Sequence, residues 1–189
     1  MPDNVGWVEY RDETGWAPVI NLWPLVAVPD PDVWSCLFLY SGEEFINFQP
    51  LAEERGFPAD ASRAVRSAFE EDAGGSSPNS LRATWVTLDE IHHMDWDELS
   101  PGYDDDPYRY RREADGRLVL EAHDHTQINQ PFGEHPVEWE SDGFVYRFEH
   151  RTRRQLIERS PHWQTLLRMM EVLGAAFGAE NVRIVIWFT

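Results

Sequence analysis

The sequence predicts an α+β protein, with a mixed β-sheet, helices packed on it and the C-terminal strand at its centre. Residues 161–177 place apolar side chains at helical spacing, and a nearly continuous apolar run, Val182–Phe188, follows them. Residues 5–10 and 144–150 instead alternate as strands do. A run that is apolar on both faces is typical of a strand covered on each side, which places Val182–Phe188 inside the sheet.

The N-terminal third predicts a hairpin and then a helix. Val5–Tyr10 alternates as a strand, residues 12–15 form a turn, and Trp16–Ile20 returns beside the first strand. Asp30 followed by proline is typical of a helix start. The apolar spacing that follows predicts a helix that ends at Gly42.

Two more helices are predicted before residue 100, after an irregular loop at 45–58. The first begins at Asp60 or Ser62 and ends at a glycine pair. The second begins with a capping box, in which Thr87 accepts from the backbone and Glu90 reaches back. It ends near residue 95 or 96.

The chain suits a single domain, 1–189, in which residues 101–160 are an inserted or enlarged β-hairpin region. A strand is expected over 117–126. Residues 137–140 and 144–150 pair as a hairpin across Ser-Asp-Gly, and Arg147 faces outward near a glutamate of the first strand.

The charge inventory narrows the possible functions. The chain has 34 acidic residues against 16 basic ones, every basic residue is arginine, and the formal net charge is -18. Without lysine there is no Walker-type phosphate loop, no Schiff base and no lysine general base. Duplex nucleic acid is not an expected partner, because binding it requires neutralising phosphates. Small molecules, metal ions and basic protein surfaces remain.

A cytoplasmic location with no membrane association is expected. Cys36 is the only cysteine, so no internal disulfide can form, which suits a reducing compartment. The N-terminus has no signal-peptide pattern. No apolar run approaches the roughly 20 residues that span a bilayer.

One set of residues predicts a metal site. Glu121, His123 and His125 alternate on a predicted strand and so share one face. His135 lies a loop away and would complete a tetrahedral set for a divalent transition metal such as zinc, manganese or iron. The alternative is a solvated strand face with polar side chains.

Two arginine clusters predict an anionic ligand. Arg151, Arg153 and Arg154 form one, and Arg109 with Arg111 forms the other, on an Arg- and Tyr-rich stretch. One expectation is that the fold of the inserted region brings the two clusters together. The alternative is that each arginine pairs with a nearby carboxylate.

Signatures of common enzyme classes are absent from the sequence. It has no Gly-x-Ser-x-Gly elbow, no Gly-x-Gly-x-x-Gly and no Cys-x-x-Cys. No catalytic residue is assigned, and whether the protein is an enzyme is left open.

Three stretches together resemble a family of small proteins found in tailed phages and in bacterial, often prophage-like, genomes. They are Phe45–Ser62, the segment from Trp85 through Thr87-Leu88-Asp89-Glu90 to Trp96, and Trp163–Phe188. The family's His-Ser-His-Ser stretch corresponds here to residues 81–84, Leu-Arg-Ala-Thr. The resemblance implies the fold outline and a phage or prophage context, and it implies no reaction.

Three functions follow from these observations. The first is a non-enzymatic acidic protein that binds a partner with a basic surface, as a phage- or prophage-encoded modulator of a host or defence protein. Its sharpest form is a mimic of duplex nucleic acid. The second is a metal-dependent hydrolase or nucleotide-acting enzyme that uses the His/Glu site. The third is a small-molecule binding module lined by tryptophan.

Overall fold

The α+β class is confirmed. A computed structural model describes residues 4–26, 31–38, 48–52, 55–74, 81–104, 106–123 and 137–188. In chain order the elements are β1 (Asn4–Asp12), β2 (Gly15–Asn21), α1 (Leu22–Leu25), α2 (Pro31–Leu37), α3 (Arg63–Asp72), β3 (Arg82–Thr87), α4 (Leu88–His93), β4 (Tyr108–Arg112), β5 (Leu118–His123), β6 (Glu138–Ser141), β7 (Phe144–Arg147), α5 (Arg153–Arg159), α6 (Pro161–Phe177), η2 (Ala179–Asn181) and β8 (Val182–Phe188).

The described strands form two sheets, where the sequence suggested one. The first has the order β2-β1-β8-β3 and the second β5-β4-β7-β6. All pairings between described strands are antiparallel, so neither sheet has the mixed character that was expected.

Strand β8 lies inside the first sheet, as its apolar sequence predicts. It pairs with β1 on one side and β3 on the other, and both of its faces are buried. Val182, Ile184 and Ile186 face a large core formed with α2, α4, α5 and α6. Val185 and Trp187 face a smaller core beneath α3.

Helix ends lie where the sequence places capping residues. Ser62 caps α3, and α6 begins at a proline after Ser160 and ends at Gly178. Both halves of the capping box are present at Thr87, where α4 begins. A second capping box begins α5, with Thr152 and Gln155.

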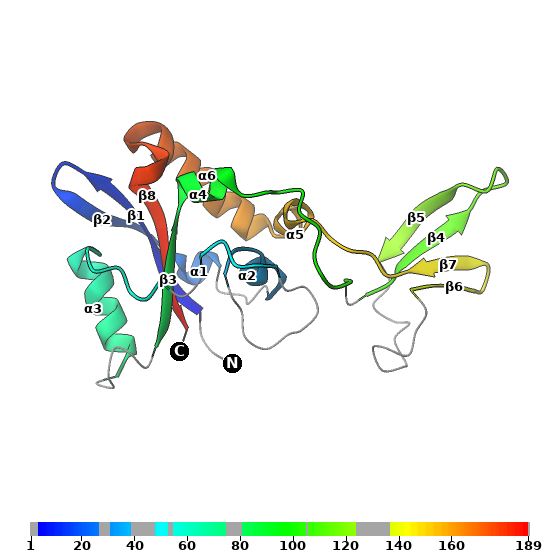
Figure 1. Ribbon diagram of the computed structural model, residues 1–189, viewed down its shortest axis with the longest axis horizontal. Coiled ribbons are helices and arrows are strands. Elements are labelled where there is room, and N and C mark those ends of the chain that lie inside the picture. Colours follow the sequence, from blue (N-terminus) through cyan, green and yellow to red (C-terminus); the bar gives the residue numbers. More distant parts are fainter. Residues whose placement is uncertain are drawn as a thin grey trace.

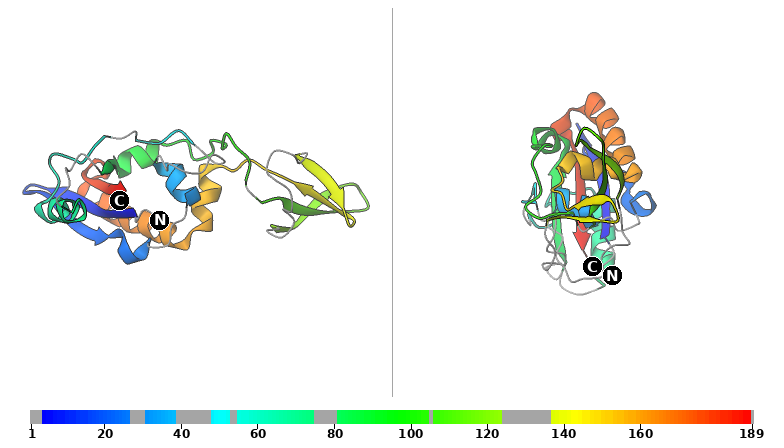
Figure 2. Two further views of the ribbon diagram at one scale, coloured as in Figure 1. Left: turned by 90° about the horizontal axis from the view of Figure 1, so that it is seen from below. Right: turned by 90° about the vertical axis from the view of Figure 1, so that its right-hand side faces the viewer.

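The second sheet stands apart from the first. Figure 1 shows β4–β7 at one end of an elongated molecule, with α5 and two connecting segments between the sheets. The left view in Figure 2, seen from below, shows the same separation. The connecting segments, residues 98–104 and 148–154, are called the neck below.

The predicted hairpin at residues 137–150 is confirmed. β6 pairs with β7, and Asp142 (φ 52°) and Gly143 (φ 82°) both take the left-handed conformation that a two-residue type I′ turn requires. Arg147 forms an ion pair with Glu138 across the two strands at 2.5 Å, as expected.

Candidate functional site

The neck is a ribbon of two segments joined by backbone hydrogen bonds. Ser100 donates its amide to the Arg151 carbonyl at 2.7 Å, and Asp104 donates its amide to the Glu149 carbonyl at 2.8 Å. An isolated bridge joins residue 99 to residue 152. His150 Nδ1 lies 2.8 Å from the Ser100 carbonyl, so this nitrogen carries the proton.

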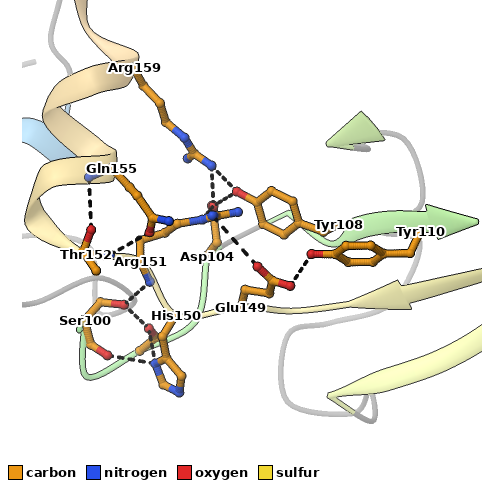
Figure 3. A network of polar contacts seen from close by, with 11 residues as sticks. Ser100, Asp104, Tyr108, Tyr110, Glu149, His150, Arg151, Thr152, Gln155 and Arg159 are labelled. Carbon is orange, nitrogen blue, oxygen red and sulfur yellow. Dashed lines mark hydrogen bonds and ion pairs between the residues drawn. The ribbon is translucent and has the colours of Figure 1, made fainter. Parts of the chain in front are cut away.

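The Asp104 carboxylate is the centre of a buried polar network, drawn in Figure 3. One oxygen, Oδ2, accepts from Arg151 Nε at 3.0 Å, from Arg159 Nη2 at 2.9 Å and from the Tyr108 hydroxyl. Arg159 also donates to the Tyr108 hydroxyl oxygen. These four residues come from the neck, from β4 and from α5, so the network joins the second sheet to the body.

The Arg151 guanidinium lies over the ring of Tyr108, a residue of the second sheet. It sits 3.6 Å from the ring centre of Tyr108, a cation–π contact, and its side chain is 10% exposed. Burial lowers the pKa of Arg151, the Asp104 hydrogen bond opposes this, and the nearby Arg159 charge lowers it further. The guanidinium remains charged at any physiological pH because its ordinary pKa lies above 12.

A second tyrosine anchors the sheet to the neck. Tyr110 donates its hydroxyl hydrogen to the Glu149 carboxylate. Burial, together with the hydrogen bond and negative charge of Glu149, raises the pKa of Tyr110 to about 12. The phenol therefore stays protonated and continues to donate across the physiological range.

The structure assigns the first predicted arginine cluster to internal contacts. Arg153 is buried and donates to the Cys36 carbonyl, the Gln49 carbonyl and the Glu98 carboxylate. Arg154 is exposed and pairs with Asp97 at 3.0 Å. Arg151, Arg153 and Arg154 therefore each contact a different set of partners.

The second predicted cluster is likewise engaged within its own sheet. Arg111 pairs with Glu121 at 2.7 Å and with Glu113 at 3.0 Å. Arg109 lies 5.0 Å from the ring centre of Phe144. Among the described residues the two clusters approach each other at Tyr108, which precedes Arg109 and lies against Arg151, while Arg153 and Arg111 contact different partners.

The predicted metal site is described only in part. Glu121 lies on β5 and is held by Arg111, while the backbone of His123 ends the same strand. His125 and His135 lie outside the described residues. Within the described ranges, no group of three or more His, Cys, Asp or Glu side chains is placed to hold a metal ion. The four-residue site stays a prediction.

A second buried ion pair lies in the first sheet. Arg183 on β8 and Glu9 on β1 are directly paired residues, 1% and 0% exposed, and Arg183 donates twice to one Glu9 oxygen. Arg183 also donates to Asp60 and stacks on Trp16 at 3.7 Å. Nothing in the linear sequence marks these partners, which are 174 positions apart.

No family model, no curated protein and no solved structure matches the chain. No helix among the described residues is long and apolar enough to cross a membrane. The geometry of the site must therefore carry the functional argument alone.

Proposed function

We propose that the chain is a non-enzymatic binding protein whose partner presents a basic surface, and that it acts as a phage- or prophage-encoded modulator of a host or defence protein. The observation that carries the proposal is the internal engagement of the arginines. When the arginines pair with carboxylates of the same chain, the excess acids leave a net negative charge, which attracts basic proteins.

At least ten of the sixteen arginines form ion pairs with carboxylates of the same chain, and several are buried. They are Arg55, Arg111, Arg112, Arg117, Arg147, Arg151, Arg153, Arg154, Arg159 and Arg183. The ten arginines offset at most ten acidic charges, yet the chain has more than twice as many acids as arginines. The remaining negative charge is therefore carried by acids without a cation beside them.

Some of these acids are exposed on helices and loops of the body. Glu70 and Glu71 lie at the end of α3, Asp95 follows α4, and Glu158 lies on α5. None of the four forms an ion pair with another described residue at the distances that define such pairs. A basic partner would approach such acids under long-range attraction that salt screens.

The projecting sheet supports a binding role in a second way. The neck's hydrogen bonds and the Asp104 network hold β4–β7 away from the body, which extends the reach of the molecule (Figure 1). A buried network of this kind fixes an orientation. An extended, oriented surface suits contact with another macromolecule.

The small-molecule alternative receives less support from the tryptophans. Trp34, Trp163 and Trp187 are fully buried and pack within the two cores of the body. Trp34 and Trp163 form an edge-to-face pair at 5.1 Å. These rings contribute to folding and do not line an open surface.

The decisive experiment identifies the partner and measures how binding depends on charge. The protein is crosslinked in cells of its source, the captured proteins are identified, and the affinity of each purified candidate is measured between about 0.05 and about 0.5 M salt. We expect affinity to fall steadily with salt and to fall at low salt in a Glu70→Gln/Glu71→Gln variant. The matched control is Val172→Ser, which changes an exposed apolar residue and no charge. A salt-independent affinity would contradict the proposal.

The metal-dependent alternative is tested on the same preparation. Elemental analysis that finds nearly stoichiometric transition metal, lost in His123→Ala, would replace the binding proposal with an enzymatic one. Assays would then turn to phosphoesters.

A further inference from the structure

We propose that β5 is a self-association strand, and that a second copy of this chain adds to it in antiparallel orientation to form one continuous sheet. A strand at the edge of a sheet presents unpaired backbone groups and accepts another strand unless something prevents it. The chain has four such edges among its described strands, and three of them carry a protecting feature.

The protecting features differ from edge to edge. β2 contains Pro18, which has no amide hydrogen to donate. β6 has only four residues and carries Glu138 and Glu140. Beside β3, the Arg55 amide donates to the Thr84 hydroxyl at 3.5 Å, so another segment already lies along that edge.

Strand β5 has no proline, and its one acid, Glu121, lies where a bulge interrupts the register with β4, so the edge before it, residues 118–120, is unprotected among the described residues. Its sequence begins Leu118, Val119 and Leu120, and among the described residues it pairs only with β4. Leu120 is 54% exposed although it is a large apolar side chain. In Figure 1 β5 forms the upper edge of the projecting sheet.

The backbone amide and carbonyl groups that could pair with another strand point away from β4. Glu113 donates its amide to the Arg117 carbonyl at 2.8 Å, which closes the β4–β5 turn with a hydrogen-bonded pair. Bonded and non-bonded pairs alternate along antiparallel strands. The amide and carbonyl groups of Leu118 and Leu120 therefore point away from β4, toward the open edge.

A register centred on Val119 uses all of these groups. It sets Leu118 against the partner's Leu120 and Val119 against the partner's Val119, so four backbone hydrogen bonds form across the twofold axis. The same register sets Arg117 against the partner's Glu121. Both of these residues lie on the Val119 side of the sheet, and Arg117 is 68% exposed with only a 3.8 Å pair to Glu113.

The charge near β5 is close to zero, so two copies can meet there without the repulsion that the net charge of the whole chain would cause. The net charge of -18 opposes self-association, yet residues 108–123 contain four arginines and three acids. Two copies that meet along β5 therefore bring together nearly neutral surfaces, and their acidic bodies lie at the far ends. Over distances beyond the Debye length, about 8 Å at physiological salt, the bodies are screened from each other.

The first test is the mass of the untagged protein in solution across a wide range of concentration, by light scattering and sedimentation. The short ladder predicts a weak dimer, so the mass should rise from 22.0 kDa toward twice that value. Leu120→Lys should hold the protein at 22.0 kDa over the same range. Val19→Lys, an exposed edge residue of the first sheet, should leave the dimer intact.

The second test fixes the register. A cysteine at Val119 would face its own copy across the twofold axis at a separation that a disulfide bridges. Val119→Cys should give a covalent dimer under mild oxidation at a rate at least tenfold above Val19→Cys, and Cys36 is buried and should not react. A monomer at all concentrations, or equal crosslinking at the two sites, would overturn the proposal. Neither result bears on the basic partner.

Discussion

The buried Glu9–Arg183 pair gives the sharpest prediction about stability. Replacing Arg183 with methionine leaves the Glu9 carboxylate in a site where both side chains are at most 1% exposed. Breaking one partner of such a pair costs about 3–5 kcal/mol, because an uncompensated charge stays buried. Glu9 still accepts from the Ser62 amide at 2.8 Å, which offsets part of that cost.

The double variant separates pairing from packing. Replacing both residues with apolar ones of similar volume removes the stranded charge, so Glu9→Leu/Arg183→Met should cost much less than the two single changes added together. Urea unfolding followed by tryptophan fluorescence gives each free energy of unfolding. For a chain of this length a single variant should melt about 6–20 °C lower. Single variants that cost under about 1 kcal/mol, or strict additivity, would refute the reasoning.

Three further predictions follow from other sites. The pKa of Tyr110 is about 12 in the folded protein against an ordinary 10, so protonated Tyr110 contributes stability that is complete below pH 10 and lost as pH rises through 12. Ultraviolet titration should show a late-titrating phenol in the wild type that the Tyr110→Phe variant lacks. If the two proteins titrate alike there, the Glu149 hydrogen bond is contradicted. Gly6→Ala should destabilise more than Gly174→Ala in chemical unfolding, because the new methyl meets a backbone oxygen at 2.6 Å in the first case and a flexible side-chain end in the second. Thr87→Ala removes the cap of α4 and should cost about 1 kcal/mol in the same assay, whereas no change would mean that the cap is not formed in solution.

The parts of the fold that the sequence predicts are those in which one local signal dominates. Helix α6 has a long apolar stripe, a proline at its start and a glycine after its end. Strand β8 follows as an apolar run that belongs inside a sheet. The hairpin of β6 and β7 is marked by its Asp-Gly turn. These signals need no knowledge of the rest of the chain.

Other elements give mixed local signals. Strand β4 reads Tyr-Arg-Tyr-Arg-Arg, which resembles a charged patch because tyrosine and arginine are both partly apolar and partly polar. Strand β3 alternates no more clearly, since Thr84 is buried beside apolar neighbours. Their place in the sheets depends on pairing with distant strands, and a single sequence does not show such pairing.

The contacts of the candidate site also depend on residues that are far apart in the sequence. Arg151 stood out in the sequence because arginines cluster near it, whereas its partners Asp104 and Tyr108 lie more than forty positions earlier. Arg159 joins them from the end of α5. The sequence could suggest that arginines matter near residue 151, and only the fold could show that a carboxylate is already in place.

The buried cations of this chain depend on chemistry that arginine supplies and lysine does not. Arg183 donates to Glu9 and to Asp60 while it lies over the Trp16 ring. Arg151 donates to Asp104 while it lies over the Tyr108 ring. A lysine ammonium has no plane to stack and no rigid fork of donors, so it cannot take either place. Among the described residues, three arginines, Arg151, Arg153 and Arg183, take such buried positions. Most of the others lie at least partly exposed and pair with carboxylates at the surface. Stacking and forked donation, which hold the body and the neck together, therefore give arginine an interior role that lysine cannot fill.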